Sequence, residues 1–129
     1  MPRARRGHLS AADDFVAAIN AHDPDAIGAL MTDDHLFVDA EGNEYRGRAA
    51  MHDAWRGYFG WFPDYQIEIE RTVSVEGVTG LFGWASATYT GNGRSWRLPG
   101  AWLAVERDGL VAEWRVYCDT RLPAEIIGS

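Results

Sequence analysis

The second half of the chain alternates between apolar and polar residues over long segments, a pattern typical of β-strands. Four such segments follow one another, over residues 65–76, 78–90, 94–106 and 110–119. Short turns that contain glycine separate them, at Gly77, Gly91-Asn92-Gly93 and Asp108-Gly109. The pattern predicts an antiparallel meander of four long strands.

The first half has the three-to-four-residue spacing of amphipathic helices. Ser10 is the expected N-cap of a helix that ends near Ala21, and Asp23 with Pro24 starts a second, shorter helix. A third helix begins at Gly47. Its apolar stripe consists of Met51, Ala54, Trp55, Tyr58 and Phe59.

A short hairpin is expected between the second and third helices, with strands from His35 to Ala40 and from Glu44 to Arg46. Helices followed by an antiparallel meander predict an α+β domain, in which three helices cover one face of a curved sheet and enclose a hydrophobic pocket. Several strands are apolar on both sides, so the outer face of the sheet needs a cover. We expect a homodimer that forms through this face.

Length and composition fit one globular domain, because 129 residues, 47% of them hydrophobic, suffice for one core and not for two. We assign the domain to residues 10–127 and a disordered basic tail to residues 1–9. Residues 7–129 hold nine arginines against 19 acidic residues, a balance that repels nucleic acid. No segment has the ~20 apolar residues of a membrane span. The first fifteen residues lack the apolar core of a secretory signal. We therefore expect a cytoplasmic protein without membrane contact.

The composition also limits the chemistry. All twelve basic residues are arginine, which excludes a lysine Schiff base. The single cysteine, Cys118, excludes an internal disulfide and a cysteine-rich zinc site. Metal-ligand spacings and nucleophile-elbow motifs are absent. We expect neither a metal nor another cofactor.

The last predicted strand ends on a carboxylate, Asp119, which is the leading candidate for a functional group. Tyr117 and Asp119 share one face of the strand. The apolar residues 126–127 follow a turn and are placed to fold a tail back over Asp119, which would shift its pKa. The alternative is a surface aspartate that caps the C-terminal turn.

Three stretches resemble the nuclear transport factor 2-like superfamily, and its SnoaL-like group in particular. They are FVAAINAHDPDAIGALMTDDHLFVD, YRGRAAMHDAWRGYFGWFPD and DGLVAEWRVYCD. The resemblance covers about residues 10–127 and implies a cone-shaped α+β fold. That fold hosts isomerases, polyketide cyclases, epoxide hydrolases, dehydratases and non-catalytic modules, so the pocket has to decide the function.

The resemblance implies roles for two aspartates. Asp39 is similar to the base of ketosteroid isomerases, but the oxyanion-hole donors of those enzymes fall at Phe15 and Ala101, whose side chains donate no hydrogen bond. Asp119 is similar to the acid/base aspartate of polyketide cyclases, which form a carbon-carbon bond by aldol addition without a cofactor.

The resemblance to limonene epoxide hydrolases is less complete. Asp119 is similar to their water-holding aspartate, and their other catalytic positions fall at Phe37, Asp39, Phe82 and Trp84. The arginine and the acid that act on the epoxide are therefore missing.

We expect a cofactor-free enzyme that binds a flat, mostly apolar, polyketide- or terpenoid-like molecule and moves protons with Asp119 and Asp39. The expected substrate-binding residues are Phe15, Phe37, Met51, His52, Trp55, Phe82, Trp84 and Tyr117. His35 and His52 are either proton shuttles or ordinary surface residues. Two alternatives stay open, an epoxide hydrolase of the limonene type and a non-catalytic ligand-binding or dimerisation module. For Asp39, the alternative is a cap of the turn at Gly42.

Overall fold

The computed structural model describes residues 10–129, and the tail expected over residues 1–9 lies outside them. Four helices are present in this part of the chain: α1 (Ala11–Asn20), α2 (Pro24–Ala29), α3 (Arg48–Trp61) and α4 (Arg121–Gly128). The strands are β1 (Met31–Val38), β2 (Glu44–Arg46), β3 (Gln66–Val75), β4 (Val78–Thr88), β5 (Ser95–Arg107) and β6 (Leu110–Tyr117). The α+β class predicted from the sequence is confirmed.

The helices begin where the sequence predicts. The Ser10 hydroxyl accepts a hydrogen bond from the Asp13 amide, and the Asp13 carboxylate accepts one from the Ser10 amide, which closes a capping box at the start of α1. Asp23 caps α2, whose first residue is Pro24. These caps satisfy amide groups that otherwise have no partner at a helix start.

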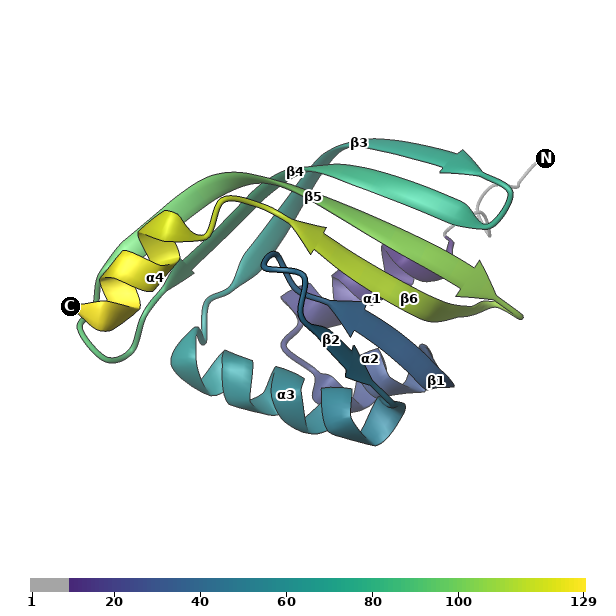
Figure 1. Ribbon diagram of the computed structural model, residues 1–129, viewed down its shortest axis with the longest axis horizontal. Coiled ribbons are helices and arrows are strands. Elements are labelled where there is room, and N and C mark those ends of the chain that lie inside the picture. Colours follow the sequence, from purple (N-terminus) through teal and green to yellow (C-terminus); the bar gives the residue numbers. More distant parts are fainter. Residues whose placement is uncertain (1–9) are drawn as a thin grey trace.

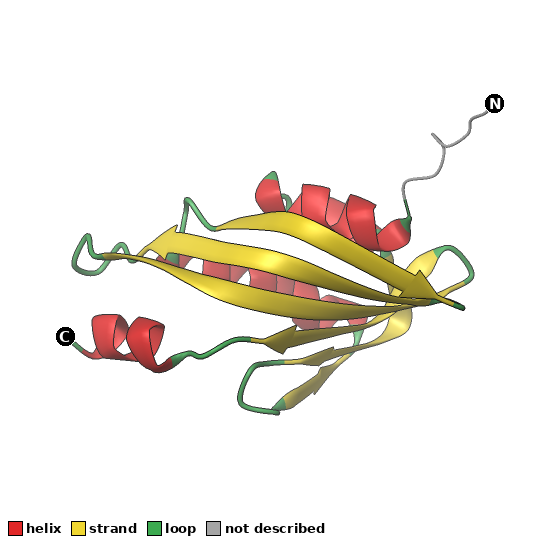
Figure 2. Ribbon diagram, turned by 90° about the horizontal axis from the view of Figure 1, so that it is seen from above, coloured by secondary structure: helices red, strands yellow, loops and turns green. Residues whose placement is uncertain are grey.

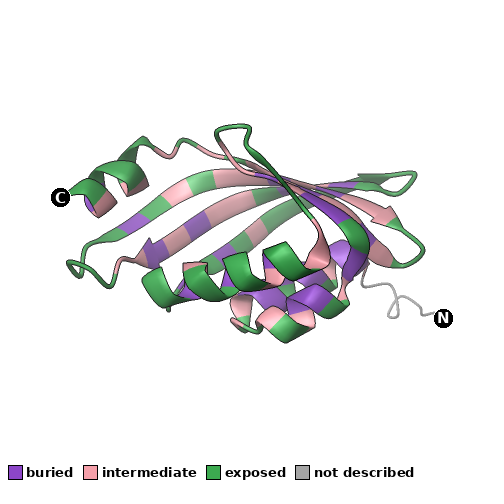
Figure 3. Cartoon of the chain, turned by 60° about the horizontal axis from the view of Figure 1, so that its bottom comes forward, coloured by how far each residue is buried: buried purple, intermediate pink, exposed green. Residues whose placement is uncertain are grey.

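The strands form one curved, open sheet in the order β2-β1-β6-β5-β4-β3. Strands β3 to β6 make the predicted antiparallel meander, and β1 extends it by pairing in parallel with β6. Helices α1, α2 and α3 lie on one side of this sheet (Figures 1 and 2). The buried residues of the strands are interspersed with exposed ones, as alternation requires (Figure 3).

One strand differs from the sequence-based expectation. β1 begins at Met31, four residues before the predicted start at His35. The intervening Thr32-Asp33-Asp34 has the composition of a turn, but Met31 pairs with Val111 of β6 and a register shift between Met31 and Leu36 accommodates the polar residues.

The C-terminal residues form helix α4, where the sequence indicated only a turn and an apolar run. Ile126 is 1% exposed and anchors α4 to the core. The Asn92 side chain, in the β4–β5 turn, donates a 2.7 Å hydrogen bond to the Ile126 carbonyl. α4 therefore lies beside the β4–β5 turn at one end of the sheet (Figure 1). None of the helices within residues 10–129 is long and apolar enough to cross a membrane.

Candidate functional site

A cavity of about 420 Å³ lies between α3 and the inner face of the sheet. This volume falls within the roughly 300–1,000 Å³ of small-molecule sites. The lining residues come from α3, α4, five of the six strands and the segments beside them: Phe37, Asp39, Ala40, Glu41, Tyr45, Met51, Ala54, Trp55, Tyr58, Tyr65, Ala85, Trp96, Leu98, Trp102, Trp114, Val116, Cys118, Thr120 and Pro123.

The sheet side of the cavity is built by pairing large residues with small ones. Trp96 of β5 lies opposite Ala87 of β4, and Trp114 of β6 lies opposite Ala104 of β5. Trp102 lies over Gly100, where a Cβ atom would sit 2.8 Å from the indole ring. The small neighbours leave room for the indole rings on the sheet.

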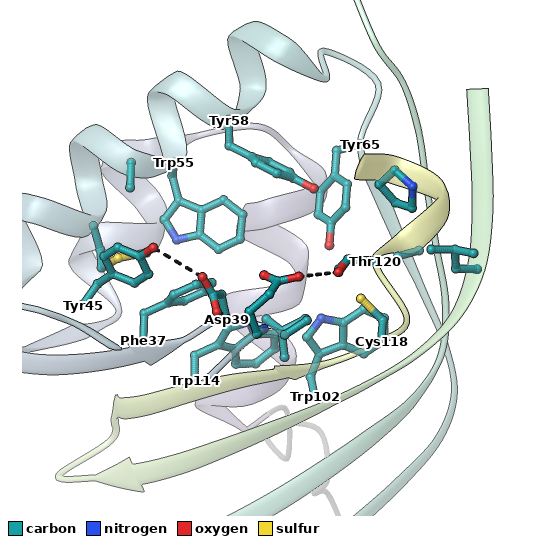
Figure 4. Close-up of a pocket in the computed structure, with 18 of the residues that line it drawn as sticks. Phe37, Asp39, Tyr45, Trp55, Tyr58, Tyr65, Trp102, Trp114, Cys118 and Thr120 are labelled. Carbon is teal, nitrogen blue, oxygen red and sulfur yellow. Dashed lines mark hydrogen bonds between the residues drawn. The ribbon is translucent and has the colours of Figure 1, made fainter. Parts of the chain in front are cut away.

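The opposite wall comes from α3 and the segment after it. Trp55 and Tyr58 are three residues apart and point from α3 into the cavity, and Tyr65 faces them (Figure 4). The Tyr58 and Tyr65 rings meet edge to face at 5.1 Å. Burial is the largest cause that raises the pKa of both hydroxyls, so both stay protonated at neutral pH.

The mouth of the cavity is where its lining becomes exposed, between the β1–β2 turn and the segment before α4. Glu41 is exposed, and Tyr45 is 45% exposed. The Thr120 hydroxyl donates a hydrogen bond to the Glu41 carboxylate, which joins the two sides of the mouth (Figure 4). Neither Asp39 nor Glu41 forms an ion pair with any residue between 10 and 129.

Asp39 combines a structural and a cavity-lining position. Its Oδ1 accepts hydrogen bonds from the Glu41 and Asn43 amides at 3.0 and 2.9 Å, which stabilises the turn around Gly42. Its Oδ2 accepts from the Asn43 side chain at 3.1 Å and from the Tyr45 hydroxyl at 3.3 Å. Asp39 therefore caps the turn at Gly42, as the alternative predicted, and the same carboxylate also lines the cavity.

A family model described as the SnoaL-like domain matches residues 12–114. The chain belongs to the SnoaL-like family. A search of curated proteins gave no match.

Solved structures support the SnoaL-like fold. A putative SnoaL-like polyketide cyclase from Shewanella denitrificans OS-217 superposes with a TM-score of 0.82 at 15% identity, covering 98% of each chain. An NTF2-like protein from Burkholderia thailandensis E264 gives a TM-score of 0.80 at 20% identity, covering 91% of this chain and 94% of that one. TerC, co-crystallised with polyporic acid, gives 0.80 at 18% identity, covering 92% and 96%. At these identities the likeness shows the fold alone.

The structure places Asp119 outside this cavity, which corrects the expectation that it shares a wall with Asp39. Its side chain is 54% exposed and pairs with Arg121 at 2.5 Å. The Arg121 guanidinium and amide lower the pKa of Asp119 to about 2, the opposite direction from a covered base. Helix α4 does not cover it: Asp119 is exposed and follows β6, which ends at Tyr117, and its neighbour Cys118 is the residue that lines the cavity.

Three further residues expected in the SnoaL-like pocket lie on the other face of the sheet. Phe82 and Tyr117 are 45% and 53% exposed. Trp84 lies 4.1 Å under the Arg97 guanidinium and donates a hydrogen bond to Glu70. In β4 the inward positions are Leu81, Ala85 and Ala87, so alternation directs residues 82 and 84 outward.

Phe15 and the two histidines are also outside the cavity. Phe15 is fully buried and packs against Trp114 at 4.8 Å and against His35 at 5.9 Å. His35 is fully buried, and its Nδ1 lies 2.8 Å from the Val111 carbonyl oxygen. His52 lies in a separate surface depression between α2 and α3, where it contacts Asp25 at 2.6 Å.

Four of the ten expected site residues therefore line the cavity: Asp39, Phe37, Met51 and Trp55. The sequence contained the signal for several that the prediction missed. Tyr58 follows Trp55 by three residues on the predicted stripe, and Trp114, Val116 and Cys118 share the apolar face of the last strand. Glu41 had no such signal, because its position depends on the path of a turn.

Metal ligands do not gather at this site. Within residues 10–129 no three histidine, cysteine, aspartate or glutamate side chains are grouped as they would be around a metal ion. The expectation of a cofactor-free protein stays a prediction.

Proposed function

We propose that this SnoaL-like protein is an enzyme that binds a flat, mostly apolar small molecule and moves a proton at carbon with Asp39, without a cofactor. The observation that carries the proposal is the position of Asp39, a carboxylate on the wall of a mostly apolar cavity of about 420 Å³ that is rich in aromatic residues. An isomerase or a cyclase of the polyketide type fits this arrangement.

The cavity walls support a flat substrate. The Trp55 and Tyr58 rings face the indoles of the sheet across the cavity (Figure 4). Aromatic walls supply affinity by burial and stacking and need no charge on the ligand.

The proposed step transfers one proton. The Asp39 carboxylate removes a proton from a carbon next to a carbonyl group, the electron pair of the C–H bond forms a C=C bond, and the carbonyl oxygen takes the negative charge. In a substrate that has a C=C bond beside the carbon that loses the proton, returning the proton to the far carbon of that bond gives an isomer. Attack of the carbon on a second carbonyl group closes a ring, and the alkoxide oxygen formed there takes the proton back from Asp39. Neither outcome consumes an oxidant or a reductant. The Tyr45 hydroxyl makes the longest of the four contacts to Asp39, and the substrate replaces it.

An epoxide hydrolase is a weaker fit. Such an enzyme of the limonene type needs an arginine beside an acid at the epoxide. No arginine is among the residues that line the cavity, within the part of the chain that the structure describes.

The test is deuterium exchange at the carbons next to the carbonyl of 2-tetralone, followed by NMR in D₂O with and without the protein. We expect the protein to accelerate exchange above the buffer rate. Asp39→Asn should lower the accelerated rate by roughly 100-fold or more, because general base catalysis contributes about 10²–10⁴-fold.

Asp119→Asn is the matched control, since it makes the same chemical change outside the cavity, and it should exchange as the parent does. A parent protein that binds 2-tetralone but never exchanges its protons would favour the non-catalytic module instead.

A further inference from the structure

The cavity between α3 and the sheet is lined by acidic side chains without a basic one to balance them. Asp39 and Glu41 both line it, and neither arginine nor histidine is among the lining residues in the described part of the chain. Neither carboxylate forms an ion pair within residues 10–129. The protein therefore leaves two carboxylates at this cavity without a positive partner.

Glu41 has acceptor capacity to spare. The Thr120 hydroxyl donates a hydrogen bond to its carboxylate. This bond lies beside the Tyr65 hydroxyl and Trp102, so the carboxylate reaches the cavity itself (Figure 4). A carboxylate accepts about four hydrogen bonds, and Asp39 already accepts four. Of the two, Glu41 is the one with oxygen lone pairs left for a ligand.

The two carboxylates impose their sign on other groups that line the cavity. Burial is the largest cause that raises the pKa of the Cys118 thiol, and the charge of Glu41 raises it further. The charge of Asp39 is the largest cause that raises the pKa of Tyr45. Burial opposes a charge of either sign, whereas the carboxylates oppose a negative charge and favour a positive one. A negatively charged ligand is therefore disfavoured in this cavity.

The aromatic walls suit a positive charge. Trp55 and Tyr58 stand at 85° with ring centroids 6.1 Å apart, and Tyr58 and Tyr65 at 89° and 5.1 Å. Rings that are perpendicular to one another present their faces in more than one direction. A cation is attracted to such a face within about 6 Å, and sets of aromatic rings bind ammonium groups in this way.

A buried polar group without a partner indicates that a bound molecule completes the cavity. Trp102 is 2% exposed and points into the cavity (Figure 4). Its indole N–H has no hydrogen-bond partner within residues 10–129. Buried polar groups in folded proteins are nearly always paired. The indole thus points to a ligand, and the carboxylates indicate which charge that ligand carries.

Resting on the function proposed above for the choice of site, we propose that the ligand of this cavity carries a positively charged amine on its flat apolar frame. The ammonium group lies at the mouth, against the Glu41 carboxylate and the faces of the aromatic rings. The frame lies between α3 and the sheet, and Asp39 is left for the proton transfer. The ligand class is thus the protonated or quaternary amines of aromatic and polycyclic molecules, and not their carboxylic acids.

The test compares three ligands that share the tetralin frame and differ in charge near neutral pH. The ligands are 2-aminotetralin, which is positive, 2-tetralol, which is neutral, and tetralin-2-carboxylate, which is negative. Calorimetry or ligand NMR gives the three dissociation constants. We expect the amine to bind at least roughly tenfold more tightly than the alcohol, and the carboxylate at least roughly tenfold more weakly.

Glu41→Gln tests the residue that holds the charge. It keeps the shape of the side chain and an acceptor for Thr120, so it removes little besides the charge. The preference for the amine over the alcohol should fall by roughly three- to tenfold, and the binding of 2-tetralol should stay unchanged.

Glu44→Gln is the matched control. It makes the same change in charge on β2, at an exposed residue that does not line the cavity, and should keep the preference of the parent. Equal binding of 2-aminotetralin and 2-tetralol to the parent would overturn the inference. An equal loss of preference in Glu41→Gln and Glu44→Gln would overturn it as well.

The two proposals can fail separately, because the binding series involves no proton transfer and 2-tetralone, the ligand of the exchange assay, is neutral. A preference for the amine together with proton exchange that does not depend on Asp39 would refute the proposed role of Asp39 and leave the ligand class standing. Exchange that depends on Asp39, with equal binding of the amine and the alcohol, would refute the ligand class alone.

Discussion

The two faces of the sheet are formed by the same strands but differ in how far their apolar side chains are exposed. On the inner face, Trp96, Trp102 and Trp114 are at most 7% exposed. On the outer face, Phe82 and Tyr117 remain 45% and 53% exposed, and Val73, Val75 and Val78 between 39% and 63%. Both faces are rich in apolar side chains, and only the inner one is covered within residues 10–129.

The faces also differ in how they hold charge. Ion pairs lie on the outer face, including Arg97 with Glu68 at 2.9 Å and Arg115 with Glu113 at 2.5 Å. The buried polar residues of the described chain are Thr32, His35 and Thr79, of which only His35 has an ionisable side chain. The inner face therefore carries the buried core of the sheet, while the ion pairs of the outer face stay in contact with solvent within the described residues.

The largest expected effect separates two tryptophans. Trp114→Ala, on the inner face, should lower the free energy of unfolding by about 3–5 kcal/mol, because it removes a fully buried indole and leaves a void. Trp84→Ala, on the outer face, should cost at most about 1 kcal/mol, since it loses mainly the contact with Arg97. Urea denaturation measures both. Equal losses would show that the outer face is as well packed as the inner one.

Most of the fold could be predicted from the sequence, because local signals and alternation point to the same arrangement. Ser10, Asp23 and Pro24 mark helix starts, and the glycine turns delimit the meander. The parallel pairing of β1 with β6 was not predictable, since it joins residues about 80 positions apart, such as Met31 and Val111.

The site was less predictable because two kinds of evidence disagreed. Alternation already set Cys118 inward and Asp119 outward, while the resemblance to known enzymes favoured Asp119 as a functional group. The structure follows alternation. Glu41 was missed because turn geometry, unlike strand alternation, leaves no periodic pattern in the sequence.

A second prediction concerns the cover of the outer face. We propose that a second copy of the chain packs there, over Phe82 and the exposed valines. Phe82→Asp should shift the protein from dimer to monomer in sedimentation or light scattering, because an unpaired charge in a buried interface opposes association.

Leu122→Asp is the matched control for that measurement. The exposed fraction of Leu122, 39%, is similar to the 45% of Phe82, but Leu122 belongs to α4 and not to the sheet. It should leave the mass unchanged. A parent protein that is monomeric at all concentrations would exclude the dimer.

The smallest expected effect concerns His35, the buried ionisable residue, and shows whether it stays uncharged in the folded protein. Burial lowers the pKa of His35 below its ordinary value of 6.5, against the opposing hydrogen bond to Val111 and the nearby charges of Asp34 and Glu113. Below about pH 6.5, His35 therefore binds a proton in the unfolded chain but not in the folded one. The free energy of unfolding falls as the pH decreases below that value. Melting temperatures between about pH 8 and about pH 5 should decline in the parent and decline less in His35→Gln. Parallel curves for the parent and His35→Gln would mean that the buried imidazole takes up a proton in the folded protein as it does in the unfolded chain. The inner face would then hold a buried charge, contrary to the contrast drawn between the two faces.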